Sequence, residues 1–217
     1  GLIAAGTASG LGKDVTILER NERPARKVVI TGKGRCNVTN NCKELNELIS
    51  NVPVNGRFLY SAFSNFIPQD TIELIEDMGV PLKCERGNRV FPVSDKALDI
   101  VDALVHYGTD DGAEIVNARA KELIIENGEL KGVRTFDDEE FYADSVLIAT
   151  GGMSYQATGS TGDGYDLARQ AGHTIVEPKP SLVPLNAHEG FCSDLMGLSL
   201  RNVGMKVIDT EKNNNVV

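Results

Sequence analysis

Residues 1–19, GLIAAGTASGLGKDVTILE, carry the strongest indication of how this chain folds. Residues 1–10 predict a helix whose small side chains allow close packing against a sheet, and Gly12 ends that helix. Residues 14–18 predict a β-strand, with Glu19 at its carboxyl end. A helix that leads into a strand ending in an acid is the second half of a βαβ dinucleotide-binding unit.

The first strand and most of the glycine turn of such a unit would precede Gly1. We therefore expect Gly1 to be the last glycine of a G-x-G-x-x-G turn, which places Glu19 about 20 residues on, where the ribose-binding acid belongs. A carboxylate there accepts hydrogen bonds from ribose hydroxyls and repels a 2′-phosphate. The spacing alone fits an ordinary surface glutamate equally well. Residues 212–217 stop inside a possible hairpin turn, so both ends indicate a fragment.

Composition argues against several classes of partner. The 22 basic and 31 acidic residues give the 217-residue chain a net charge of −9, which argues against nucleic acid or an anionic membrane surface. No apolar run approaches the roughly 18 residues of a transmembrane helix. The four cysteines are unevenly spaced, unlike a secreted disulfide framework. We expect a cytoplasmic protein whose partner is a small molecule, and the oligomeric state is not indicated.

The rest of the chain alternates predicted helices and strands, as an α/β fold requires. Helices are predicted in two segments within residues 44–79 and at 95–107 and 161–171, and strands at 82–85, 89–91, 114–118, 121–126, 130–135, 140–143 and 173–176. Residues 145–149 predict a buried strand of the parallel-sheet type. Three prolines, Pro178, Pro180 and Pro184, then break the pattern. We predict one domain over residues 1–185 and the start of another over residues 186–217.

Three glycine-rich segments could contact a ligand. In residues 32–37, GKGRCN, two glycines let the backbone approach an oxyanion while Lys33 and Arg35 add positive charge. Residues 149–152, ATGG, follow the predicted buried strand, and residues 158–164, TGSTGDG, precede a helix whose first N–H groups are free. A flexible turn, a plain strand end and a helix cap at Asp163 are the corresponding structural interpretations.

Cysteine and histidine do not indicate a metal site. A zinc site requires clustered ligands, whereas the three histidines and four cysteines are scattered. Five residues separate Cys36 from Cys42, whereas a flavin disulfide reductase of the glutathione reductase kind has four between its redox pair. We therefore predict neither a metal centre nor a redox disulfide.

Taken together, several motifs resemble one family. They are the helix and strand ending at Glu19, Gly32-x-Gly34-Arg35-Cys36-Asn37-x-Thr39-Asn40, Ala149-Thr150-Gly151-Gly152-x-Ser154-Tyr155, and Thr158-Gly159-Ser160-Thr161-Gly162-Asp163-Gly164-Tyr165. The set resembles the NAD(P)/FAD-dependent oxidoreductases of the aminoacetone oxidase-like and bile-acid-reductase-like kind. The resemblance implies a Rossmann-like FAD-binding domain of the two-dinucleotide-binding-domain type, with a β-rich domain inserted after about Pro184.

The resemblance also implies FAD as the cofactor and assigns residues to it. Glu19 would hold the adenosine ribose, Gly1 would belong to the pyrophosphate turn, and Ala120 could offer backbone contacts to adenine. Arg20 and Lys27 would lie near the ribose and phosphates. Thr150 and Gly151 would close over the cofactor. The residues implied to pass close to the pyrophosphate and flavin are Gly32, Gly34, Arg35, Cys36 and Asn37.

The predicted function is an FAD-dependent oxidoreductase that acts on an unidentified small molecule, with NADH or NADPH as a possible electron donor. The flavin would carry the redox chemistry and the protein would position it. No catalytic acid or base is indicated, and Tyr155 and His173 are candidates for substrate contact only. The alternative is a non-catalytic module that binds FAD or another adenine nucleotide.

Overall fold

The computed structural model describes residues 1–180, 186–200, 203–204, 206, 208–209 and 215–216. These residues form two compact units, Gly1–Ile175 and Val176–Val217, which we describe separately. The boundary predicted after residue 185 falls beside residues 181–185, which lie outside the described residues, so the division into domains stays a prediction.

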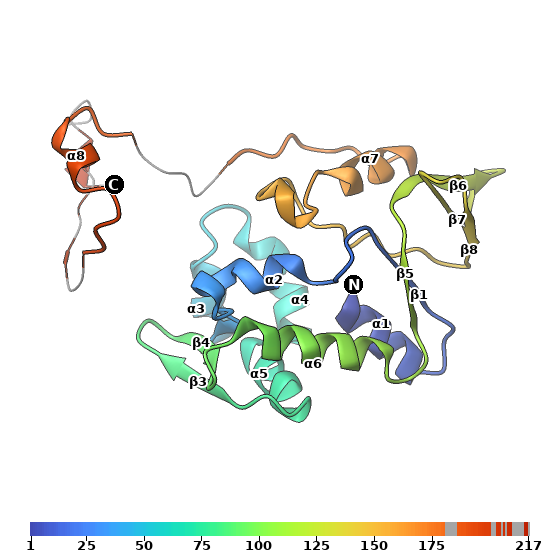
Figure 1. Cartoon of the computed structure of the whole chain (residues 1–217), viewed down its shortest axis with the longest axis horizontal. Coiled ribbons are helices and arrows are strands. Elements are labelled where there is room, and N and C mark those ends of the chain that lie inside the picture. Colours follow the sequence, from blue (N-terminus) through green and yellow to red (C-terminus); the bar gives the residue numbers. More distant parts are fainter. Residues whose placement is uncertain (181–185, 201–202, 205, 207, 210–214, 217) are drawn as a thin grey trace. The chain divides into compact units, whose positions relative to one another are not determined.

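The first unit is built around a parallel pair of strands and the helix that precedes each of them. Helix α1 (Leu2–Gly10) leads into β1 (Thr16–Glu19), and β1 pairs in parallel with β5 (Glu114–Asn117) so that Glu19 lies opposite Asn117. Helix α6 (Ala97–Thr109) precedes β5 and packs against α1 (Figure 1). Each strand of the pair therefore follows a helix, which confirms the predicted α/β class.

Between β1 and α6 the chain forms short elements. These are α2 (Arg26–Ile30), η1 (Thr31–Gly34), β2 (Thr39–Asn40), α3 (Leu45–Ser50), η2 (Gly56–Leu59), α4 (Tyr60–Asn65), α5 (Pro68–Asp77), β3 (Leu82–Glu85) and β4 (Arg89–Pro92). Strands β2, β4 and β3 form an antiparallel sheet in that order. A buried cluster of Cys36, Ile75, Ala97 and Ile100 joins this region to α6.

A second antiparallel sheet follows β5. It consists of β6 (Ala120–Glu126), β7 (Glu129–Thr135) and β8 (Glu140–Tyr142) in that order. The predicted β6–β7 hairpin is confirmed, and Asn127 and Gly128 at its tip both have positive φ angles, as a tight two-residue turn requires. Helix α7 (Asp163–Gln170), preceded by η3 (Gln156–Thr158), contacts β6.

Two predicted strands are wrong. Residues 145–149 form no strand, and Leu147 and Ile148 are 68% and 39% exposed, whereas Val146 is partly buried. Among the described residues this segment pairs with no strand, and the only partner of β1 is β5. Residues 173–176 are likewise unpaired, and Val176 is 88% exposed. An apolar pattern specifies a strand only where another strand pairs with it.

The second unit contains α8 (Phe191–Asp194) and an antiparallel pair, β9 (Ile208–Asp209) and β10 (Asn215–Val216). In the described part of the chain, no helix combines the length and apolar character that a membrane crossing needs.

Candidate functional site

The carboxyl end of β1 presents a fixed carboxylate. Oε1 of Glu19 accepts hydrogen bonds from the backbone N and from Nδ2 of Asn21, both at 2.8 Å. Nδ2 of Asn117, at the end of β5, donates to the carbonyl oxygens of Glu19 at 3.0 Å and Asn21 at 2.9 Å. Oε2 of Glu19 has no hydrogen-bond partner among the described residues, so one oxygen of a held carboxylate is free to accept a bond from a ligand.

The segment that follows residue 148 runs beside this strand end. A Cβ placed on Gly1 would lie 3.8 Å from Cβ of Ala149, so the start of α1 approaches this segment closely. Nδ2 of Asn21 donates to the carbonyl oxygen of Thr158 at 3.3 Å. Gly159 has φ +97°, and a Cβ there would lie only 2.7 Å from Nδ2 of Asn21. Only glycine fits this approach.

Thr150 and Gly151 pack against the start of α7. A Cβ on Gly164 would lie 2.4 Å from Oγ1 of Thr150, and a Cβ on Gly151 would lie 3.0 Å from Oγ of Ser160. Gly151 has φ +78°, the left-handed conformation that glycine adopts at little cost. Through these contacts the two glycine-rich segments, 149–152 and 158–164, pack against each other.

Asp163 gathers two arginines next to Glu19. Its carboxylate accepts bonds from Nε and Nη2 of Arg119 at 2.8 and 3.1 Å, from Nη1 of Arg20 at 3.3 Å, and from Oγ1 of Thr161 at 2.6 Å. The alternative interpretation of Asp163 as the cap of α7 does not hold, because Gly162 is the N-cap residue and the side chain of Asp163 turns to these partners. Hydrogen bonding to Arg119 lowers the pKa of Asp163 below its usual range.

Replacement of Asp163 by Asn is expected to lower the free energy of unfolding at pH 7 by about 1–2 kcal/mol. Charge-assisted hydrogen bonds contribute about 1.5–3 kcal/mol, and screening of the partly exposed arginines reduces this. Because the pKa of Asp163 is lowered in the folded state, its contribution is present above the unfolded-state pKa of about 4 and is lost as pH falls through the folded pKa. Urea unfolding measured at several pH values from 7 to about 2.5 should show that the stability difference between wild type and Asp163→Asn decreases as the pH falls.

The matched control for that measurement is Asp166→Asn. Asp166 lies in the same helix and pairs with Arg169, but its side chain is exposed, so its removal should change stability little. Equal stabilities of Asp163→Asn and wild type at pH 7 would contradict the prediction.

Lys27 connects α2 to the segment that follows Gly152. Its Nζ donates to the carbonyl oxygen of Ser154 and lies 5.4 Å from the ring centroid of Tyr155. Tyr155 has φ +53°, an uncommon conformation for an aromatic residue. Lys27 therefore holds the start of α2 against the segment that carries Thr150 and Gly151.

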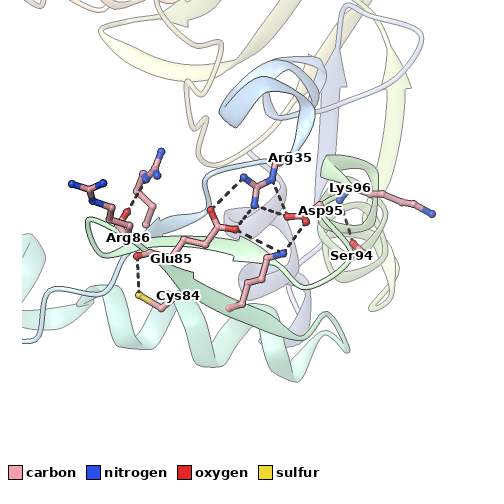
Figure 2. A network of polar contacts seen from close by, with 9 residues as sticks. Arg35, Cys84, Glu85, Arg86, Ser94, Asp95 and Lys96 are labelled. Carbon is pink, nitrogen blue, oxygen red and sulfur yellow. Dashed lines mark hydrogen bonds and ion pairs between the residues drawn. The ribbon is translucent and has the colours of Figure 1, made fainter. Parts of the chain in front are cut away.

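The GKGRCN loop lies at the other end of α2. Arg35 donates to carboxylate oxygens of Glu85 and Asp95 (Figure 2). Its guanidinium carbon lies 4.1 Å from the ring centroid of Phe91. Cys36 is 5% exposed, and burial raises the pKa of its thiol. This cysteine and Cys42 are both free thiols.

The structure thus divides the predicted cofactor residues into two groups. The first group lies around the end of β1 and comprises Gly1, Glu19, Arg20, Lys27, Thr150 and Gly151. The second group follows α2 and comprises Gly32, Gly34, Arg35, Cys36 and Asn37. Ala120 belongs to neither group by side-chain contact. It begins β6, opposite Thr135.

Sequence reasoning missed several members of the first group. Asn21, Asn117 and Arg119 had not been singled out, although Asn117 and Arg119 stand at the end of a predicted strand. Polar residues after a parallel strand meet at the ligand-binding edge of an open sheet, and that signal could have identified them.

Comparison with known proteins places this geometry in context. A family model described as HI0933-like protein Rossmann domain matches residues 1–216. A 3-dehydro-bile acid delta(4,6)-reductase of Clostridium scindens is 32% identical over 195 residues, which is 85% of this chain and 44% of that protein. A ribosomal RNA dihydrouridine synthase of Escherichia coli is 27% identical over 216 residues, 100% of this chain and 52% of that protein.

The chain therefore spans about half the length of the curated relatives that it matches. Among solved structures, THI4 of Thermovibrio ammonificans aligns with a TM-score of 0.50 and 17% identity, covering 80% of this chain and 59% of that one. Identity at this level supports likeness of fold alone.

Proposed function

Since this chain belongs to the HI0933-like Rossmann domain family, we propose that it binds FAD and is part of an FAD-dependent oxidoreductase. The observation that carries the proposal is the held carboxylate of Glu19, with one oxygen free, at the carboxyl edge of the parallel pair β1–β5. Ligands of open α/β sheets bind at this edge, and a strand-end acid suits a ribose hydroxyl.

The surrounding residues fit an extended dinucleotide. The glycines at 151 and 159 have positive φ angles and let the backbone come close to a ligand, while Arg20 and Lys27 supply positive charge for phosphates. In this proposal Glu19 binds the ribose, Gly1 and the start of α1 face the pyrophosphate, and Ala120 lies toward adenine. Thr150 and Gly151 close over the cofactor, and the 32–37 loop reaches its flavin end. Bound FAD would supply the redox chemistry, and the protein would orient it.

We propose reduction of a carbon–carbon double bond as the reaction. The two names among the relatives, a delta(4,6)-reductase and a dihydrouridine synthase, both describe addition of hydrogen to such a bond. A small unsaturated molecule is the first candidate substrate. A base in RNA is the second, because relatives with that name align over nearly the whole chain. The net charge of −9 favours the small molecule, since RNA binding depends on positive charge.

A visible absorption spectrum of the purified protein, recorded before and after anaerobic addition of NADH or NADPH, tests the proposal. We expect bands near roughly 370 and 450 nm that decrease when the correct donor is added. Absence of bands even after incubation with FAD would overturn FAD binding. Bands that dithionite bleaches but that neither NADH nor NADPH changes would favour a non-catalytic module instead.

A further inference from the structure

Arg35 lies at the centre of a network of charged side chains whose charges sum to zero. Its Nε and Nη2 donate to Oδ1 of Asp95 at 2.8 and 2.6 Å, and Nη2 and Nη1 donate to the two oxygens of Glu85 at 2.5 and 3.3 Å (Figure 2). Nζ of Lys83 donates to Oδ2 of Asp95 at 2.8 Å. Two cations and two carboxylates cancel, so Arg35 offers an anionic ligand little net attraction.

The loop that carries Arg35 has a costly backbone conformation. Gly32, Lys33, Gly34 and Cys36 all have positive φ angles, at 55°, 59°, 84° and 60°. Glycine adopts these angles freely, but the left-handed conformation is unfavourable for the two other residues, Lys33 and Cys36. Such a conformation persists only where surrounding contacts determine it, and it is often associated with a functional site.

Anchors on two sides hold this loop. Arg35 ties it to β3 through Glu85 and to the residues before α6 through Asp95. Cys36 is buried in the cluster with Ile75, Ala97 and Ile100. The ring of Phe91 packs beneath both Arg35 and Gly32, since a Cβ on Gly32 would lie 2.9 Å from Cε1 of Phe91. The loop is therefore fixed from its surface side and from its core side.

Two polar side chains of the loop are available to a ligand. Lys33 and Asn37 are exposed, and within the described part of the chain neither side chain forms a hydrogen bond or ion pair. Asn37 directly follows the buried Cys36, so the anchors determine where its amide is presented. An amide can donate and accept hydrogen bonds, and an ammonium group can pair with a phosphate.

We propose that Arg35 is a positioning residue that acts through Glu85 and Asp95 to hold the 32–37 loop, so that Lys33 and Asn37 rather than Arg35 meet the cofactor. This inference rests on the proposed function for the identity of the ligand. It assigns Arg35 a role opposite to that of a phosphate-binding arginine, and the two roles predict effects of opposite sign when a carboxylate is neutralised.

The decisive experiment measures FAD affinity by quenching of flavin fluorescence in wild type, Arg35→Gln, Glu85→Gln and the double variant. We expect each single variant to bind FAD about tenfold more weakly than wild type does. The FAD affinity of the double variant should lie within about twofold of that of Arg35→Gln. If Arg35 were a direct ligand, Glu85→Gln would free its guanidinium and strengthen binding. Unchanged or tighter binding by Glu85→Gln therefore overturns the proposal.

Arg89→Gln is the matched control. The Arg89 guanidinium also lies near the Phe91 ring, at 5.8 Å, but it donates to the carbonyl oxygen of Arg86 and, among the described residues, forms no ion pair with Glu85 or Asp95. Its FAD affinity should equal that of wild type. Circular dichroism melting of all variants separates a local effect from loss of the fold.

Hydrogen–deuterium exchange of residues 32–37 without FAD tests the positioning independently. Exchange should be at least about tenfold faster in Arg35→Gln, Glu85→Gln and Asp95→Asn than in wild type. If wild type binds no FAD, the proposed function fails, and exchange alone then decides whether Arg35 holds the loop. Unchanged exchange in all three variants overturns the inference whatever the ligand is.

Discussion

Glu19→Gln is expected to weaken FAD binding by about 10- to 100-fold. A hydrogen bond to a charged acceptor contributes about 1.5–3 kcal/mol, and each 1.4 kcal/mol corresponds to a factor of ten in affinity. Glutamine retains an oxygen for the bonds from Asn21 but places an NH2 group where Oε2 of Glu19 would accept a ribose hydroxyl. The substitution therefore removes the proposed ligand contact while preserving the local backbone.

Titration of each purified variant with FAD, followed by flavin fluorescence, measures this effect. Glu22→Gln is the control. Glu22 is an exposed carboxylate three residues further along the chain, and its replacement changes the net charge by the same amount. We expect its affinity to match wild type. Similar affinities for Glu19→Gln and wild type would show that this carboxylate does not hold the ribose.

Local patterns in the sequence predicted much of the fold. The helix and strand of residues 1–19, the β6–β7 hairpin and α6 all follow from residue types that lie next to one another. Pairing of β1 with β5 could not be predicted in the same way, because Glu19 and Asn117 are 98 residues apart. The apolar segment 145–149 showed the reverse, since its pattern predicted a strand that the described structure does not pair.

The candidate site was predictable to a similar degree. The glycine-rich motifs and the strand-end acid identified the segments that gather at the end of β1. Side-chain partners were not predictable, because Asp163 collects Arg20 and Arg119 from two distant segments and Arg35 turns to Glu85 and Asp95. A motif indicates which segment lies near a ligand, whereas tertiary packing determines which of its side chains remain free to bind one.

Gly6→Ala is expected to lower the free energy of unfolding by about 2 kcal/mol. A Cβ on Gly6 would lie 2.4 Å from the carbonyl oxygen of Tyr107 and 2.5 Å from two carbons of its ring. The carbonyl belongs to the backbone of α6 and cannot rotate away, so α1 and α6 would have to separate. Overpacking of this kind costs about 1–3 kcal/mol or more, and the better helix propensity of alanine offsets only about 1 kcal/mol.

The consequences of Gly6→Ala reach beyond one contact. On the same helix pair, Leu2 lies against Gly108, and Oγ1 of Thr7 lies 3.2 Å from the hydroxyl of Tyr107. Separation of the helices would loosen both contacts and move the start of α1 relative to Glu19, so FAD affinity should fall together with stability. Thermal melting should show a decrease in Tm of roughly 4–8 °C.

Gly10→Ala in the same helix distinguishes this packing effect from a general response to glycine replacement. Gly10 is exposed, and the nearest atom to an added Cβ is Oδ2 of Asp111 at 3.1 Å, the end of a side chain that can move. Alanine there should leave stability unchanged or raise it by up to about 1 kcal/mol. If Gly6→Ala and Gly10→Ala melt at the same temperature, close approach of α1 and α6 does not limit the stability of this fold.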